Sequence, residues 1–185
     1  VLRKKLPDLK FAVSHTTRPI RKGEKDGVDY TFISNEEFED KIKSNDFLEW
    51  AKVHNCYYGT SLQSAETPLK KGYDTLLELD IQGVKTLRDM KYQGVYILIF
   101  PPSVKELEAR LKKRGTDSEE NIHRRIETGK KEIKKYKRYD YVITNNEIED
   151  TVTTFLSILQ AEKSRVSLYK PTSPDIEELL KDGVD

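Results

Sequence analysis

Residues 14–30, SHTTRPIRKGEKDGVDY, gather hydroxyl and cationic side chains that could bind an anion. Ser14 opens the segment, Arg18 and Arg21 lie inside it, and Tyr30 closes it. Guanidinium groups offer paired N–H donors that match the oxygens of a phosphate. Two glycines in the same stretch oppose a helix. The segment is a candidate phosphate-binding loop, and a solvated basic loop that binds nothing is the alternative.

Glu49 is the second candidate, because it lies in an otherwise apolar strand pattern, FLEWAKV. Alternation along a strand places it on the same face as Phe47, Ala51 and Val53. A buried carboxylate requires hydrogen-bond donors, and two parallel donors satisfy both of its oxygens. Guanine presents such a pair in its ring N–H and exocyclic amine, whereas adenine has an acceptor at that ring position. Glu49 is therefore a candidate guanine reader, unless the strand simply points it into water.

Further polar side chains follow the other apolar runs. Glu78 and Asp80 close one run, and alternation places both on one strand face. Asn145 follows another run, and four arginines occur in EARLKKRGTDSEENIHRR: Arg110, Arg114, Arg124 and Arg125. Ligands of open parallel α/β sheets bind at the carboxyl ends of the strands. These groups suit an anion bound together with a cation or a ribose, although Glu78 and Asp80 could instead form salt bridges with the arginines.

The pattern of apolar residues predicts the elements that must position these groups. Strands are expected at 10–14, 74–80, 95–100 and 140–144, and helices at 82–91, 103–114, 118–136 and 148–165. The runs at 76–79 and 95–100 are almost continuously apolar, which is typical of parallel strands buried on both faces. Alternating strands and helices predict an α/β domain with a parallel sheet and helices on both faces.

Residues 24–63 interrupt this alternation. Strands at 29–34 and 47–53 flank an acidic helix, NEEFEDKIKSN, and CYYGTS follows without a long crossover. This order predicts a small mixed β lobe inserted into the α/β domain. The tail has two prolines and an acidic end, and we expect one or two helical turns there, loosely attached. The expected organisation is a core at 1–23 and 64–166 with a lid at about 103–128, a lobe at 24–63 and a tail at 167–185.

Composition limits the classes of protein that this chain can represent. Its 185 residues suffice for one domain, and 33 Lys+Arg against 32 Asp+Glu leave a net charge of +1. Such a balance provides no overall attraction to nucleic acid or to an anionic membrane. Cys56 is the only cysteine, the longest apolar run is too short to span a bilayer, and the three histidines lack metal-ligand spacing. We therefore expect a cytoplasmic protein without its own metal site.

From residue 1 to about 166, the chain resembles the guanylate kinase family. The matching stretches follow the family order: VSHTTRPIRKGEKDGVDYTF, FLEWAKVHNCYYGTS, LLELDIQGVKTLR, IFPPSVKELEARLKKRGTDSEENIHRRI and YDYVITNN. Members of this family transfer a phosphate from ATP to GMP in purine nucleotide metabolism. The resemblance implies a P-loop-kinase-like α/β core, an inserted GMP-binding lobe and a helical lid. It also implies Mg²⁺ bound with ATP, no nucleic-acid or membrane partner, and a monomer or homodimer.

The resemblance also implies roles for individual residues. The phosphate of GMP would be held by Ser14, Arg18, Arg21, Tyr30 and Tyr58. Glu49 and Thr60 would read the guanine edge, while Glu78 and Asp80 would lie between the two nucleotides, near the guanine amine and the Mg²⁺ shell. The residues implied in catalysis are Arg18, Arg114, Arg125 and Asp80. Those implied on the ATP side are Arg110, Arg114 and Asn145.

One family feature has no counterpart in the sequence. The family begins with a strand and a P-loop, G-x-x-x-x-G-K followed by Ser or Thr, whose amides and lysine bind the ATP phosphates. None of the nine glycines begins this motif, and VLRKKLPDLKF resembles the end of the helix that follows a P-loop. These residues alone therefore predict a GMP site and a lid without a complete ATP site.

Three interpretations are compatible with this departure. The favoured one is a working guanylate kinase whose N-terminal segment is not among these residues, because Arg114, Arg125 and Asp80 are all retained. The second is a non-catalytic guanylate-kinase-like module that binds GMP or a phosphorylated protein partner, as in membrane-associated scaffolds. Nucleic-acid binding through the lysine-rich segment 130–138 is the third, and the balanced charge opposes it.

Overall fold

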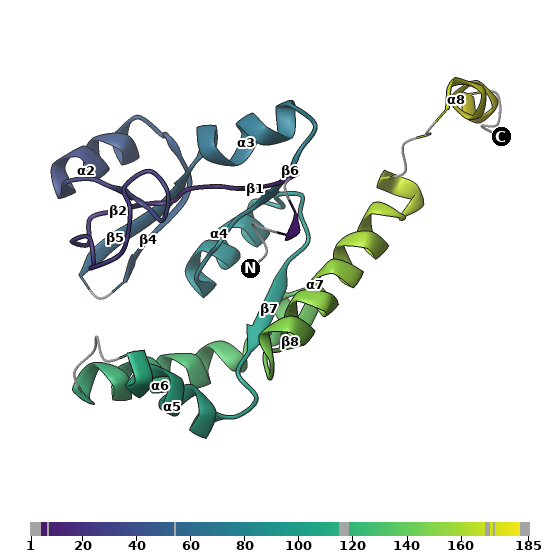
Figure 1. Ribbon diagram of the computed structural model, residues 1–185. Coiled ribbons are helices and arrows are strands. Elements are labelled where there is room, and N and C mark those ends of the chain that lie inside the picture. Colours follow the sequence, from purple (N-terminus) through teal and green to yellow (C-terminus); the bar gives the residue numbers. More distant parts are fainter. Residues whose placement is uncertain are drawn as a thin grey trace. The chain divides into compact units, whose positions relative to one another are not determined.

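A computed structural model shows how the chain folds (Figure 1). It describes residues 5–6, 8–53, 55–114, 119–168, 171 and 173–181, except for the side chain of Arg114. Contacts between backbone segments divide the chain into two compact units, Val1–Tyr96 and Ile97–Asp185. Each unit has its own strands and its own helices.

The first unit contains a four-stranded mixed sheet with the strand order β3-β2-β5-β4. Its strands are β2 (His15–Thr16), β3 (Thr31–Phe32), β4 (Phe47–Val53) and β5 (Cys56–Ser61). Strand β5 pairs antiparallel with both β4 and β2, while β2 and β3 are parallel. This sheet is the expected mixed β lobe, and it includes His15–Thr16 from before residue 24. The predicted domain boundaries themselves stay a prediction.

Helix α2 (Asn35–Lys43) covers one face of this sheet. A capping box starts the helix: the Ser34 hydroxyl accepts from the Glu37 amide, and the Glu37 carboxylate accepts from the Ser34 amide. Phe38 is completely buried and stacks on Phe47, with 4.4 Å between ring centroids. A Cβ at Gly59 would lie 3.0 Å from atoms of Phe38 and Phe47. A side chain at position 59 would press on both rings, so the close fit of α2 on the sheet favours glycine there.

A β-bulge at Leu48 changes which residues of β4 share a face. Phe47 pairs with Ser61, but the next pair is Glu49 with Thr60, so the register shifts by one residue. Phe47 consequently packs under α2, whereas Glu49 and Ala51 lie on the opposite face. The prediction that Glu49 shares a face with Phe47 is wrong, because simple alternation does not take a bulge into account.

The remaining elements of the first unit are a parallel strand pair and two helices. Strands β1 (Leu9–Phe11) and β6 (Asp74–Leu76) pair in parallel, and the helices are α3 (Leu62–Lys70) and α4 (Ile81–Asp89). The predicted strand 74–80 is too long, because β6 ends at Leu76. Helix α3 is not predicted by the sequence pattern, since Pro68 lies inside it and proline usually marks a break.

The second unit pairs β7 (Ile97–Phe100) with β8 (Tyr141–Thr144) in parallel. Its helical segments are α5 (Val104–Arg114), α6 (Glu119–Ile133), η1 (Tyr136–Arg138), α7 (Ile148–Lys163), η2 (Val166–Leu168) and α8 (Pro174–Lys181). The long helices agree with the predicted ones. The expectation of strands buried on both faces is wrong for β7, where Ile99 is 51% exposed. Among the described residues β7 has one strand partner, β8, and not the two of a central strand.

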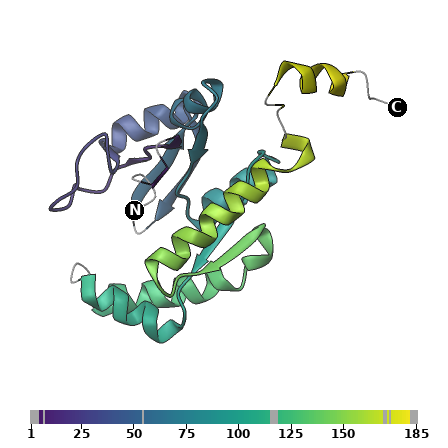
Figure 2. The same ribbon diagram turned by 45° about the vertical axis from the view of Figure 1, so that its right-hand side comes forward.

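Helices α5 and α6 form a hairpin (Figure 2). Its small core consists of buried Leu111, Ile122 and Ile126, with Leu107 packed against them. A Cβ at Gly129 would lie 3.1 Å from Leu107 Cδ2, so the glycine permits the close approach of the two helices. Among the residues that the structure describes, no helix has the length and the apolar character needed to cross a membrane.

Candidate nucleotide sites

The sheet face opposite α2 brings three candidate residues into contact. Ser14 Oγ lies 3.2 Å from Thr60 Oγ1. The backbone amide of Thr60 donates a 3.0 Å hydrogen bond to Oε1 of Glu49. This chain of contacts joins the residue before β2 to β5 and β4, so residues 46 and 11 positions apart in the sequence meet at one site.

Glu49 is the most unusual group on this face, because its residue is only 6% exposed. Burial raises the pKa of its carboxyl group, the hydrogen bonds from Thr60 oppose that shift, and the charge of Asp80 adds to it. A carboxylate accepts at about four lone-pair positions, so Thr60 does not exhaust its capacity. Glu49 can therefore accept further hydrogen bonds from a ligand that offers two donors side by side.

Arg18 is held in place by a partner that the sequence analysis missed. Its two terminal nitrogens donate to the two carboxylate oxygens of Glu24, at 3.0 and 2.8 Å, and its side chain is 11% exposed. This hydrogen-bonded pairing raises the pKa of Arg18 and lowers that of Glu24. The amide of Arg21 also donates to Glu24, at 2.8 Å. A carboxylate six residues after Arg18 in the same loop was the only sequence signal for this role.

Two tyrosines lie beside this arginine. The Arg18 guanidinium lies 5.5 Å from the ring centroid of Tyr30, and the rings of Tyr30 and Tyr58 meet edge to face at 6.0 Å. Burial raises the pKa of Tyr30, and the nearby Tyr58 and Glu78 raise it further. The Tyr30 phenol is therefore a neutral hydroxyl donor near neutral pH, which suits an anionic ligand.

Glu78 and Asp80 lie after the end of β6, and they differ in exposure and in hydrogen bonding. Glu78 is exposed. Asp80 is the N-cap of α4: its Oδ1 accepts from the amides of Gln82 and Gly83, at 3.0 and 2.9 Å. In the described part of the chain, no three His, Cys, Asp or Glu side chains gather into a metal-binding cluster.

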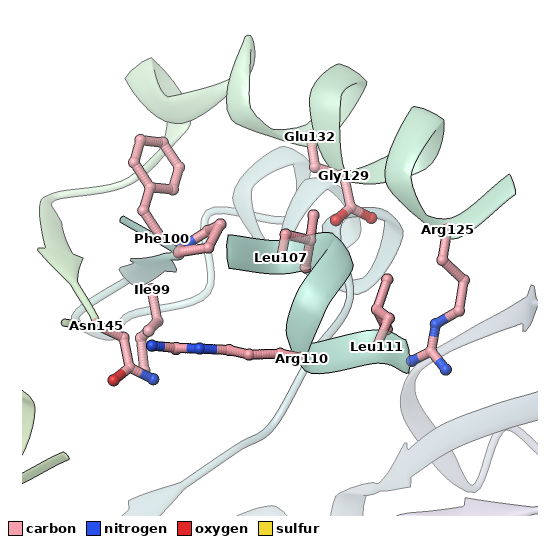
Figure 3. A pocket seen from close by; sticks show the side chains of 10 residues that line it. Ile99, Phe100, Leu107, Arg110, Leu111, Arg125, Gly129, Glu132 and Asn145 are labelled. Carbon is pink, nitrogen blue, oxygen red and sulfur yellow. The ribbon is translucent and has the colours of Figure 1, made fainter. Parts of the chain in front are cut away.

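The second unit contains a cavity of about 360 Å³ between α5, α6 and the ends of β7 and β8 (Figure 3). Its lining consists of Ile99, Phe100, Pro101, Leu107, Arg110, Leu111, Arg125, Gly129, Glu132 and Asn145. Arg110 reaches toward Asn145 at one end, and Arg125 lies at the other. Two of the predicted ATP-side residues, Arg110 and Asn145, thus line one cavity. Glu132, which the sequence analysis missed, lines it as well.

Hydrogen bonds orient the polar groups of this cavity. Arg110 donates from Nε to Glu106 Oε1 at 2.7 Å and from Nη2 to the carbonyl of Asn146 at 3.1 Å. The side-chain oxygen of Asn145 accepts from the Thr151 hydroxyl at 3.1 Å. The side chain of Arg114 and the position of His54 lie outside the described residues.

Comparisons with known proteins agree with this architecture. The guanylate kinase family model matches residues 1–162. The guanylate kinase of Clostridium tetani is 47% identical over 160 residues, which are 86% of this chain and 77% of that protein. The guanylate kinase of Carboxydothermus hydrogenoformans is 42% identical over 183 residues, covering 99% and 87% of the two chains.

A solved structure gives the same result. The crystal structure of guanylate kinase from Anaplasma phagocytophilum matches with a TM-score of 0.78 and 34% identity, over 97% of this chain and 87% of that one. This match confirms the predicted P-loop-kinase-like α/β fold. Since both the family model and close relatives cover most of its length, the chain belongs to the guanylate kinase family.

Proposed function

We propose that this protein transfers the γ-phosphate of ATP to GMP and forms GDP and ADP. The observation that carries the proposal is the buried carboxylate of Glu49, which lies on the same sheet face as Ser14, Thr60 and Tyr58. The Thr60 amide satisfies only part of the hydrogen-bonding capacity of this buried carboxylate, and unmet capacity is costly, so the position is best explained by a ligand with matching donors. Guanine has these donors, and membership of the guanylate kinase family supports the same choice of base.

The GMP phosphate is assigned to the loop that carries Arg18 and Arg21. Glu24 already fixes the plane of the Arg18 guanidinium, which reduces the conformational entropy lost when a phosphate binds. Ser14, Tyr30 and Tyr58 add hydroxyl donors to this assignment. The guanine is assigned to Glu49 and to Thr60, whose hydroxyl can donate to a base oxygen.

The ATP side is assigned to the second unit. The apolar cavity lined by Ile99, Leu107 and Leu111 suits a flat base, with Arg110 and Asn145 as its polar contacts. Arg114 and Arg125 are assigned to the transferring phosphoryl group. Phosphoryl transfer is accelerated mainly by positioning and by neutralising charge on the equatorial oxygens, which is what arginine forks provide.

In the proposed reaction, a phosphate oxygen of GMP attacks the γ-phosphorus of ATP, and the bond from that phosphorus to the β–γ bridging oxygen breaks. We include Mg²⁺ bound through the ATP phosphates, where it would neutralise charge on the β- and γ-oxygens. Asp80 is the carboxylate assigned to its hydration shell, and its hydrogen bonds to the start of α4 hold it in one orientation.

The same proposal includes a cytoplasmic location. Cys56 is the single cysteine of the sequence, so no intrachain disulfide can form, and this fits the reducing cytosol. The proposal includes no nucleic-acid or membrane partner, in line with the balanced charge of the chain. A monomer or homodimer remains part of the proposal, to be distinguished by analytical ultracentrifugation.

The test combines binding with turnover. Isothermal titration calorimetry with GMP and with AMP measures the selectivity for the base. Chromatography of a mixture of the protein with GMP, ATP and Mg²⁺ measures the GDP and ADP that are formed. We expect preferential binding of GMP, and equal amounts of GDP and ADP from a protein that includes the P-loop segment. Residues 1–185 by themselves should bind GMP without turnover, because they lack the P-loop motif. Absence of GMP binding contradicts the proposal. Binding without turnover, with displacement of GMP by a phosphopeptide, supports the binding-module alternative instead.

A further inference from the structure

Gly83 is a glycine in a position where the backbone does not require one. It is the third residue of α4, three positions after the N-cap Asp80, and its φ is not in the left-handed region. Glycine is the poorest helix former apart from proline, so its presence in a first turn indicates a packing requirement. The requirement comes from a neighbouring strand of the same unit.

The space that a side chain would occupy at Gly83 is filled by Glu49. A Cβ there would lie 2.5 Å from Glu49 Oε2, 3.1 Å from Glu49 Cδ and 3.4 Å from the Cβ of Leu79. On its other side, the same carboxylate accepts the 3.0 Å hydrogen bond from the amide of Thr60. The carboxylate of Glu49 is thus enclosed between the Cα of Gly83 and the backbone of β5.

We propose that Gly83 is a positioning residue for guanine recognition. Because glycine has no side chain, the Glu49 carboxylate can occupy the space beside it, and this space sets the orientation of the carboxylate. The inference rests on the proposed role of Glu49 as the guanine reader. Two side-by-side donors of a base can pair with both carboxylate oxygens only when the plane of the carboxylate coincides with the plane of the base. A methyl group at position 83 rotates that plane while the fold is retained, since the atom it displaces is the end of a flexible side chain.

Binding of GMP and of inosine monophosphate, which lacks the exocyclic amine, provides the readout. We expect Gly83→Ala to weaken GMP binding by roughly tenfold or more, the effect of losing one hydrogen bond to a charged group, and to reduce the GMP preference over inosine monophosphate. Gly94→Ala is the matched control, because the nearest atom to its Cβ is 3.9 Å away. It should bind both nucleotides like the unchanged protein.

Glu49→Gln separates failure of this inference from failure of the proposed function. If Glu49→Gln loses the GMP preference and Gly83→Ala keeps it, the positioning role is refuted and the role of Glu49 stands. If the unchanged protein does not prefer GMP over inosine monophosphate, both the role of Glu49 and the positioning role of Gly83 are refuted.

A stability cycle tests the same contact without any nucleotide. The thermal midpoint shift caused by Gly83→Ala is measured in the unchanged protein and in a Glu49→Ala background. We expect a decrease in the first case, and no decrease or an increase in the second, where the new methyl group has room and alanine favours the helix. This comparison remains informative if Gly83→Ala folds poorly alone, because Glu49→Ala then rescues folding. An equal decrease in both backgrounds overturns the inference.

Discussion

Substitution Glu49→Gln provides the sharpest test of how this protein recognises its base. The new side chain has nearly the same shape, but only one of its two terminal atoms can accept a hydrogen bond. Its amide oxygen can retain the bond from the Thr60 amide, which lies 3.0 Å from Oε1. The NH₂ group then takes the position of Oε2 beside Gly83. There it is a hydrogen-bond donor opposite a donor of guanine, so no hydrogen bond can form between them.

The size of the effect follows from this mismatch. Loss of a hydrogen bond to a charged acceptor costs about 1.5–3 kcal/mol, and an unpaired donor adds about 1 kcal/mol or more. A total of about 2.5–4 kcal/mol corresponds to a loss of GMP affinity of about 60-fold to 700-fold. The affinity for inosine monophosphate, which has one donor fewer, should fall by a smaller factor.

Stability should change in the opposite direction. Burial raises the pKa of the Glu49 carboxyl above its ordinary value of 4.5, so ionisation of Glu49 destabilises the folded chain at neutral pH. That penalty is present above the raised pKa and disappears as the pH falls toward 4.5. Glu49→Gln removes it, and the variant should be at least as stable as the unchanged protein at pH 7. The advantage should shrink on acidification.

Titration calorimetry at several pH values and thermal unfolding of the same samples check both expectations. Glu66→Gln is the control, since Glu66 forms an ion pair with Lys70 on α3 and is not among the residues assigned to a nucleotide. Parallel losses of affinity and of the thermal midpoint in Glu49→Gln would refute the reasoning, because they would identify Glu49 as a structural residue.

Three further substitutions address the phosphate loop and the lobe. Arg21→Ala should weaken GMP by about 10-fold to 100-fold and leave guanosine binding nearly unchanged, as measured by calorimetry; equal losses would count against the phosphate assignment. Glu24→Gln should weaken GMP less than Arg21→Ala, because it loosens Arg18 without removing a phosphate donor; an effect confined to unfolding would limit Glu24 to the stability of the loop. Gly59→Ala should destabilise the lobe by about 1–3 kcal/mol in urea unfolding, because the new methyl group meets the rings of Phe38 and Phe47; an unchanged midpoint would contradict the close packing of α2.

Local sequence patterns were sufficient for most of the architecture. Helices α4, α5, α6 and α7 were predicted from spacing of apolar residues, because an amphipathic helix needs only its own residues to show its period. Helix α3 was missed because Pro68 is a strong local signal against a helix. In the folded chain Pro68 lies in the last turn of the helix, whose Ala65 is buried.

The placement of Glu49 shows where pattern analysis ends. Its type and its apolar neighbours indicated a buried carboxylate, and the structure has it 6% exposed. The face on which it lies depends on the bulge at Leu48, which is a property of the pairing of two strands. Simple alternation therefore led to the correct burial and to the wrong set of neighbours.

The sequence alone determined the chemical inventory of this protein: arginines in one loop, a carboxylate in an apolar strand, alternating strands and helices, and a charge balance that excludes a general attraction to polyanions. Only the tertiary structure decided which of these groups meet. Arg18 with Glu24, and Glu49 with Thr60 and Gly83, are pairings across strands, turns and helix ends. Such contacts depend on register and on close packing, which are set by the whole fold and leave little trace in a single stretch of sequence.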